Sequence, residues 1–145
     1  MVLSNLSPNS RVWVYKSDRP MTAVEKNVIK EELNNFIPQW AAHGNKLFGG
    51  AEIVNDWFVV IAVDESQALA SGCSIDSSVK FIREIGERLT INFFDRMHVL
   101  ISKGGIEQNI HFSALSNYQD WKIYDPMIEN LSDYTAHWLV NISES

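Results

Sequence analysis

The segment 11–17 is the sequence feature that most constrains how this chain can fold. β-Branched and aromatic residues fill it, a composition typical of a β-strand. Successive side chains of a strand point to opposite faces, so Trp13 and Tyr15 lie on one face while Val12 and Val14 lie on the other. Both faces are therefore apolar, and a sheet that contains this strand needs a covering layer on each side.

The sequence offers two ways to cover the second face of that sheet. The C-terminal region carries Trp121 and Trp138, which can supply apolar surface from the same chain. A second subunit is the alternative, because a large exposed aromatic patch is unusual on a monomer. A homodimer is therefore one of the two arrangements that we expect.

A helix is predicted to follow the first strand and to run from Thr22 to Gly44. Thr22 and Glu25 have the spacing of a capping box. Apolar residues then recur every three or four positions on one helical face, at Ile29, Leu33, Phe36 and Trp40. Pro38 removes one intrahelical hydrogen bond, so we expect a bend near residues 34–35.

The middle of the chain predicts a hairpin, a second helix and another hairpin. The predicted elements are strands over 48–54 and 57–63, a helix over 75–89, and strands over 95–101 and 106–112. Asn55-Asp56 is a short connection that tolerates the backbone of a tight turn. Gly86 lies on the buried stripe of the helix, where we expect a close approach of the helix to the sheet.

The first six predicted elements follow the order βαββαβ. This order predicts an α+β fold with a ferredoxin-like core, to which an added antiparallel strand and a C-terminal extension are joined. We expect a single domain over residues 1–145, with a flexible N-terminus over residues 1–10.

Composition restricts the kinds of binding partner and the cellular compartment that we expect for this protein. The formal net charge is −6 and no cluster of lysine and arginine offsets it, so neither nucleic acid nor an anionic membrane is expected as a partner. The longest apolar run, 57–63, is much shorter than the roughly 20 residues of a membrane-spanning helix. A single cysteine cannot form an internal disulfide, and the N-terminus lacks a secretory pattern, so we expect a cytoplasmic protein.

The loop over residues 64–76 is the predicted functional site, because it holds the only cysteine at the start of a helix. Cys73 lies where the helix dipole favours a thiolate. The first helix is expected to end beside this loop and to bring His43 close to Cys73. One prediction is therefore a catalytic set with Cys73 as nucleophile, His43 as base, and Asp64 or Asp76 orienting the imidazole. A buried structural thiol beside a histidine that caps a helix is the alternative.

The same loop supports a second prediction, a site for a small molecule or an anion. Ser71, Gly72 and Ser74, together with the first backbone N–H groups of the helix, can hold a carboxylate or a similar anion. Ser74 or Asp76 is the expected N-cap. An ordinary strand-to-helix connection is the alternative interpretation.

Neither a metal site nor a cofactor is predicted. The histidines are His43, His98, His111 and His137. They show no ligand spacing, and one cysteine cannot build a thiolate site, so we expect the four histidines to act separately.

Short motifs in the middle of the chain resemble those of a known family. They are Trp40-Ala41-Ala42-His43-Gly44, Asp64-Glu65-Ser66, Ser71-Gly72-Cys73-Ser74-Ile75-Asp76, Ser78-Val79 and Asn92-Phe93-Phe94-Asp95-Arg96. The family consists of small, uncharacterised bacterial proteins labelled "ABC transporter ATPase". That label implies nucleotide hydrolysis, but the chain has no G-x-x-x-x-G-K-[ST] loop, and Gly49-Gly50 lacks the lysine and hydroxyl. We therefore expect no ATPase activity of that type.

Two functional hypotheses follow from the sequence. The first is a small binding or interaction module whose site is the 64–76 loop. The second is a thiol-dependent enzyme or redox protein that uses Cys73 with His43. The two differ in whether Cys73 reacts as a thiolate.

Overall fold

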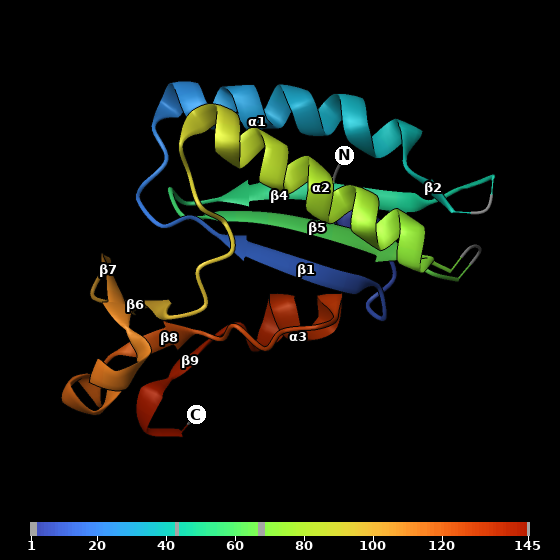
Figure 1. Ribbon diagram of the computed structural model, residues 1–145. Coiled ribbons are helices and arrows are strands. Elements are labelled where there is room, and N and C mark those ends of the chain that lie inside the picture. The colour runs from blue at the N-terminus through green and yellow to red at the C-terminus, as the bar shows by residue number, and fades with distance from the viewer. Residues whose placement is uncertain (1–2, 43, 67–68, 145) are drawn as a thin grey trace.

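A three-stranded antiparallel sheet forms the central layer of the molecule. Its strands are β1 (Arg11–Lys16), β4 (Phe48–Val54) and β5 (Phe58–Asp64), in the order β1-β5-β4. The computed structural model describes residues 3–42, 44–66 and 69–144. Two helices, α1 (Ala23–Phe36) and α2 (Gly72–Leu89), lie over one face of this sheet, as Figure 1 shows. The sequence-based prediction of an α+β fold is confirmed.

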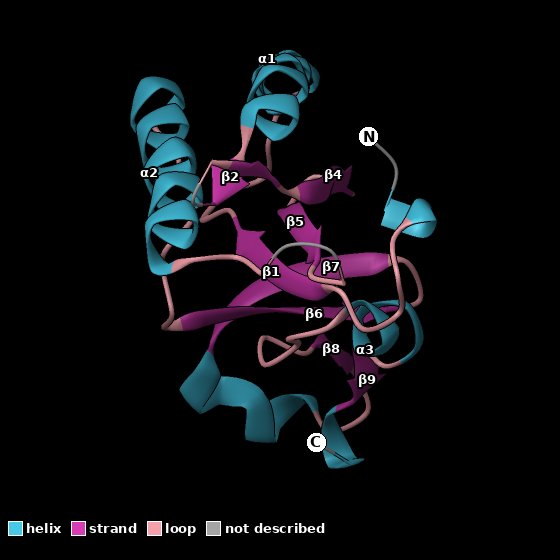
Figure 2. Ribbon diagram, turned by 90° about the vertical axis from the view of Figure 1, so that its right-hand side faces the viewer, coloured by secondary structure: helices cyan, strands magenta, loops and turns pink. Residues whose placement is uncertain are grey.

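A second antiparallel sheet lies on the other side of the central sheet (Figure 2). Its strands are β6 (His98–Lys103), β7 (Ile106–His111), β8 (Lys122–Tyr124) and β9 (Leu139–Asn141), in the order β7-β6-β8-β9. A 3-10 helix (Phe112–Tyr118) and the short helix α3 (Leu131–Ala136) connect these strands. The molecule therefore has three layers, with helices, one sheet and a second sheet stacked in that order.

The ferredoxin-like topology is not confirmed, because β6 lies in the second sheet. In a ferredoxin-like core the fourth strand would pair with the outer edge of β1. Here part of that edge is occupied by a later segment: the N–H of Val12 donates to the carbonyl of Glu129 at 2.9 Å, and Arg11 forms a bridge with Asn130. β6 instead pairs with β7 and β8. Long-range backbone pairing thus overrides the order that local patterns suggest.

Both faces of the central sheet are covered within this chain. Trp13 and Tyr15 pack toward α1 and α2. On the opposite face Val12 and Phe58 pack with Trp138, whose ring centroid lies 4.7 Å from that of Phe58. The predicted cover by the C-terminal region is confirmed for Trp138, whereas Trp121 belongs to a separate cluster within the second sheet.

The helix α1 begins as predicted and ends earlier than predicted. The Thr22 hydroxyl accepts the N–H of Glu25, and the Glu25 carboxylate accepts the N–H of Thr22, which confirms the capping box. The predicted end at Gly44 is wrong, because a 3-10 helix over Ile37–Gln39 follows directly after Phe36. Pro38 has no N–H to continue the α-helical ladder. The chain is then extended at Trp40 and forms the short strands β2 (Ala41–Ala42) and β3 (Asn45–Lys46).

The N-terminal segment, for which the sequence predicts flexibility over residues 1–10, buries Leu3 and Ser10 against the rest of the molecule. A 3-10 helix over Leu3–Asn5 buries Leu3 against the face of the central sheet that is opposite to α1 and α2. The N–H of Leu131 donates to the carbonyl of Ser10 at 2.8 Å, which ties this segment to α3. No helix within the described ranges is both long and apolar enough to cross a bilayer.

Gly86 near the end of α2 allows a tight turn out of the helix. Thr90 has a left-handed backbone with φ of 58°, and the N–H of Ile91 donates to the carbonyl of Gly86 at 2.8 Å. A Cβ atom at Gly86 would lie only 2.5 Å from the carbonyl oxygen of Ile91. The close approach predicted for Gly86 is therefore made by the chain that leaves α2.

This geometry reverses the usual effect of a helical glycine-to-alanine substitution. Alanine in a helix normally stabilises by about 1 kcal/mol. We expect Gly86→Ala instead to lower the free energy of unfolding by about 1–3 kcal/mol, because backbone atoms must move to accept the methyl group. Gly72→Ala is the matched control in the same helix, since a Cβ there meets no atom within 4 Å. Urea unfolding of both variants checks the prediction, and a Gly86→Ala variant as stable as the parent would contradict it.

Candidate functional site

The 64–76 loop begins with a carboxylate that holds two parts of the chain together. Asp64 ends β5, and its carboxylate accepts the N–H of Ser66 at 3.0 Å and the N–H of Ser7 at 3.1 Å. Hydrogen bonds from the Ser66 hydroxyl, the Ser66 N–H and the Ser7 N–H hold the pKa of Asp64 below its ordinary value. Asp64 is therefore an ionised anchor for the loop and for the N-terminal segment.

Glu65 anchors the other side of the loop. Its carboxylate accepts the N–H of Ala70 at 2.8 Å and lies 3.7 Å from the guanidinium of Arg11. The acidic residues at the strand end thus bind backbone groups and a neighbouring cation. A metal ion is not needed to balance their charge.

The start of α2 is capped by Ser71, so the prediction that Ser74 or Asp76 is the N-cap is wrong. The Ser71 hydroxyl accepts the N–H of Ser74 at 3.1 Å, and the Ser74 hydroxyl accepts the N–H of Ser71 at 2.8 Å. This reciprocal pair is a capping box in which serine replaces the usual glutamate. The helix consequently begins at Gly72, before the predicted start at Ile75.

The same capping box limits what the loop can bind. Both hydroxyls of the predicted anion site, on Ser71 and Ser74, are engaged with each other's backbone. Ser74 is also buried, and its carbonyl accepts the indole N–H of Trp40 at 2.8 Å. A ligand that used these hydroxyls would have to open the cap. Gly72 contributes only backbone to such a site.

The predicted catalytic set is only partly placed by the structure. Cys73 is exposed in the first turn of α2, and Asp76 is exposed one turn later. His43 lies outside the described residues, so its predicted contact with Cys73 stays a prediction. The bond from Trp40 to Ser74 does bring the end of the first helical segment to the start of α2, as the sequence suggests. Asp64 is occupied with backbone groups.

Two surface cavities lie away from this loop. One, of about 430 Å³, lies between α1 and β4. The other, of about 540 Å³, lies beside the end of α2 and is lined in part by Asp18, Arg83 and Phe94. The guanidinium of Arg83 lies over the Phe94 ring at 4.9 Å, so these two lining side chains pack against each other.

A histidine pair that the sequence analysis treated as separate residues is brought together by the second sheet. β6 and β7 pair His98 with His111, and their ring centroids are 5.5 Å apart. Asp95 lies 2.8 Å from Nδ1 of His98. The sequence analysis did not foresee that these two rings are neighbours. The turn at Gly104-Gly105 was the available signal, because His98 and His111 are equally distant from it along the hairpin.

Comparisons with protein-family models, with curated proteins and with solved structures find no match to this chain. Any functional assignment therefore rests on the side chains that the structure describes.

The capping box at Ser71 makes a stability prediction for the start of α2. We expect Ser71→Ala to lower the free energy of unfolding by about 1 kcal/mol, because alanine lacks the hydroxyl that accepts the N–H of Ser74. Ser77→Ala is the control: Ser77 is exposed in the same helix, its hydroxyl bonds only the Ser74 carbonyl, and its loss should cost within about 0.5 kcal/mol. Thermal unfolding of the two variants distinguishes them, and equal stabilities would argue against a functional cap at Ser71.

Proposed function

We propose that this protein is a small binding module that takes an extended polypeptide segment along the free edge of β4. The observation that carries the proposal is the cavity of about 430 Å³ between that strand and α1. A groove between a helix and an edge strand is a recurrent way to bind a peptide as an added strand. The groove replaces the 64–76 loop as the preferred site, because the polar groups of that loop bond one another.

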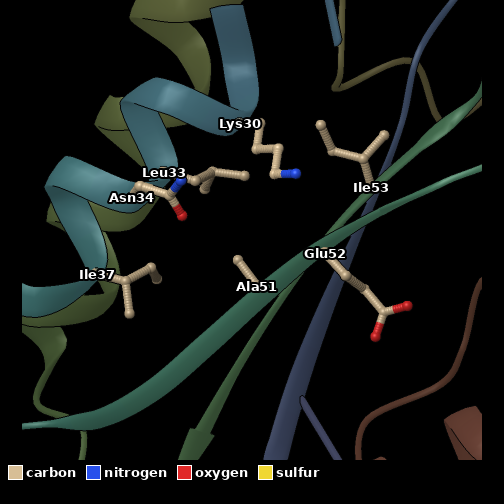
Figure 3. A pocket seen from close by; sticks show the side chains of 7 residues that line it. All are labelled: Lys30, Leu33, Asn34, Ile37, Ala51, Glu52 and Ile53. Carbon is tan, nitrogen blue, oxygen red and sulfur yellow. The ribbon is translucent and has the colours of Figure 1, made fainter. Parts of the chain in front are cut away.

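The groove has an apolar floor and a polar rim. Its lining residues are Lys30, Leu33, Asn34 and Ile37 of α1 and the following 3-10 turn, and Ala51, Glu52 and Ile53 of β4. Figure 3 shows that the side chains of Ala51 and Ile53 point toward α1, whereas Glu52 points to the opposite side of the strand. The lining therefore alternates as expected for a strand with one face toward a helix.

The backbone of β4 supplies the second half of the proposed interaction. Among the described strands, β4 pairs only with β5, so one edge of this seven-residue strand is unpaired. Unpaired N–H and C=O groups on a strand edge are a template for another strand. Main-chain hydrogen bonds would give affinity, and the floor formed by Leu33, Ala51 and Ile53 would give selectivity.

The lining also indicates the chemistry of the segment. An aliphatic side chain fits the floor between Leu33 and Ile53, and a neighbouring acidic side chain would face the ammonium of Lys30 on the rim. We therefore propose an extended segment with alternating aliphatic positions and an acidic residue on the same face. A second copy of β4 is the competing occupant, and it would give the homodimer that the sequence allows.

A displayed library of linear peptides tests this function. We expect selected peptides to bind with micromolar affinity and to shift the backbone NMR signals of β4 and of the facing side of α1. Asn34→Trp should weaken binding at least about tenfold by filling the groove. Asn35→Trp is the matched control, because Asn35 is also exposed on α1 but does not line the cavity.

Three results would count against this proposal. They are a selection with no enrichment, peptides that bind the Asn34→Trp variant as tightly as the parent, and signal shifts confined to other elements. A concentration-dependent dimer, measured by sedimentation and disrupted by Asn34→Trp alone, would identify the second copy as the occupant.

We propose a thiol-dependent enzyme or redox protein, with Cys73 as its centre and His43 as base, as the second candidate function. The observation in its favour is the exposure of Cys73 in the first turn of α2, where a reagent can reach the sulfur. Asp76 is the carboxylate of the predicted set that stays exposed. A small anion on the backbone N–H groups of Gly72 and Cys73 belongs to the same proposal, because it would sit at the same helix end.

Alkylation of Cys73 by iodoacetamide as a function of pH tests the second candidate. The chain has one cysteine, so the label reports a single site. A catalytic thiol should reach half its maximal rate below the reference pKa of about 8.5 that a free cysteine shows. His43→Gln should then shift the profile toward that reference, whereas His137→Gln should leave it unchanged. A parent profile that matches a free cysteine would remove this candidate.

A further inference from the structure

We propose that His98 and His111 form a binding site for a divalent transition-metal ion of the zinc class. The site lies on the second sheet and is independent of the groove at β4. Neither the candidate loop nor the proposed peptide site uses these residues. Imidazole nitrogen is a preferred ligand of zinc, copper and nickel ions.

The relative position of the two rings suits a shared ion. His98 and His111 are directly opposite on neighbouring antiparallel strands, with ring centroids 5.5 Å apart and ring planes at 86°. With a metal–nitrogen distance of about 2 Å, two imidazoles on one tetrahedral ion have centroids about 5 Å apart. Both side chains are partly exposed, and a small rotation, which for His111 takes place against the Phe112 ring on which it stacks, covers the difference.

Asp95 prepares His98 as a metal ligand. Its Oδ2 lies 2.8 Å from Nδ1 of His98, and the backbone N–H of Met97 donates to its Oδ1 at 2.8 Å. An ionised Asp95 favours the proton on Nδ1 of His98, which leaves the lone pair of Nε2 free. A carboxylate that holds a histidine in this way is a common second layer around protein-bound metals.

Ser113 holds His111 in a different way, because its backbone N–H donates to Nδ1. Nδ1 of His111 lies 2.7 Å from the Ser113 hydroxyl and accepts the Ser113 N–H at 3.2 Å. Binding through Nε2 requires the proton on Nδ1, where it can be donated to the hydroxyl oxygen of Ser113. Metal binding therefore breaks the bond from the Ser113 N–H to Nδ1, and this exposed N–H is left to donate to water. Within the described part of the chain, Nε2 of either histidine has no hydrogen-bond partner.

The nearby charges and the number of protein ligands determine the metal affinity that we expect. Lys16 is the nearby cation, and its ammonium is held by the Asn109 side chain and the Ser17 carbonyl, both at 2.9 Å. Asp95 offsets that charge. The described residues contain no group of three or more histidine, cysteine, aspartate or glutamate side chains arranged around one point. Two protein ligands with water in the remaining positions predict binding in the micromolar range or weaker.

Calorimetric titration of the full chain with zinc chloride, in a buffer that does not chelate metals, tests the proposal. We expect one zinc ion per chain, and each of the substitutions His98→Gln and His111→Gln should weaken binding at least about tenfold. His137→Gln is the matched control, because His137 is exposed on another part of the chain and should leave binding unchanged. Asp95→Asn should weaken binding about tenfold without abolishing it, as expected for a positioning residue.

Nitrogen NMR of the histidine rings provides a second readout. Zinc should move the Nε2 signals of His98 and His111 and should leave a proton on Nδ1 of both rings. Zinc binding that is unchanged in His98→Gln and His111→Gln, or zinc-dependent shifts confined to the other histidines, would overturn the proposal. The absence of any zinc binding by the parent protein would also overturn it. Normal unfolding curves for the glutamine variants would show that a loss of binding reflects a loss of ligands.

Discussion

The architecture depends on one strand that is apolar on both faces. Every residue of β5 from Phe58 to Val63 is buried. Val59 and Ile61 point toward the helices, whereas Val60 and Ala62 point toward the second sheet. A strand buried on both sides needs two covering layers, because each exposed aliphatic side chain would lose about 1.5–3 kcal/mol of transfer free energy. The helices supply one layer, and the C-terminal half of the chain supplies the other.

Local signals made the elements of the central sheet predictable. The apolar segment 11–17, the capping box at Thr22 and the Asn55 turn each specify an element through contacts close in sequence, and Asn55 does adopt a left-handed backbone with φ of 45°. The partner of β6 was not predictable in this way. Its position depends on β8 and on the occupation of the β1 edge by Glu129. These pairings join residues far apart in sequence, and no local pattern encodes them.

The candidate sites also differ in how far the local sequence predicts them. The sequence located the cysteine at a helix start and left open whether its thiol is exposed or buried. The position of the cap was misjudged, because Ser71 and Ser74 are equally good capping residues by composition. The groove between α1 and β4 has no sequence signature, since it arises from the packing of two elements. The pairing of His98 with His111 is partly predictable from the sequence. It follows from hairpin symmetry, but only once the turn at Gly104 is fixed.

Hydrogen bonds between two segments that are far apart in the sequence affect how the protein folds during synthesis. The carbonyl of Ser10 accepts the N–H of Leu131, and the carbonyl of Pro8 accepts the N–H of Ser132. A ribosome makes these acceptors long before it makes their donors. The helical layer can assemble early. The face of β5 that is opposite to the helices stays in contact with water until α3 has left the ribosome. The chain must therefore be synthesised through α3 before the last layer closes, and a nascent chain arrested before Leu131 would expose an aggregation-prone sheet.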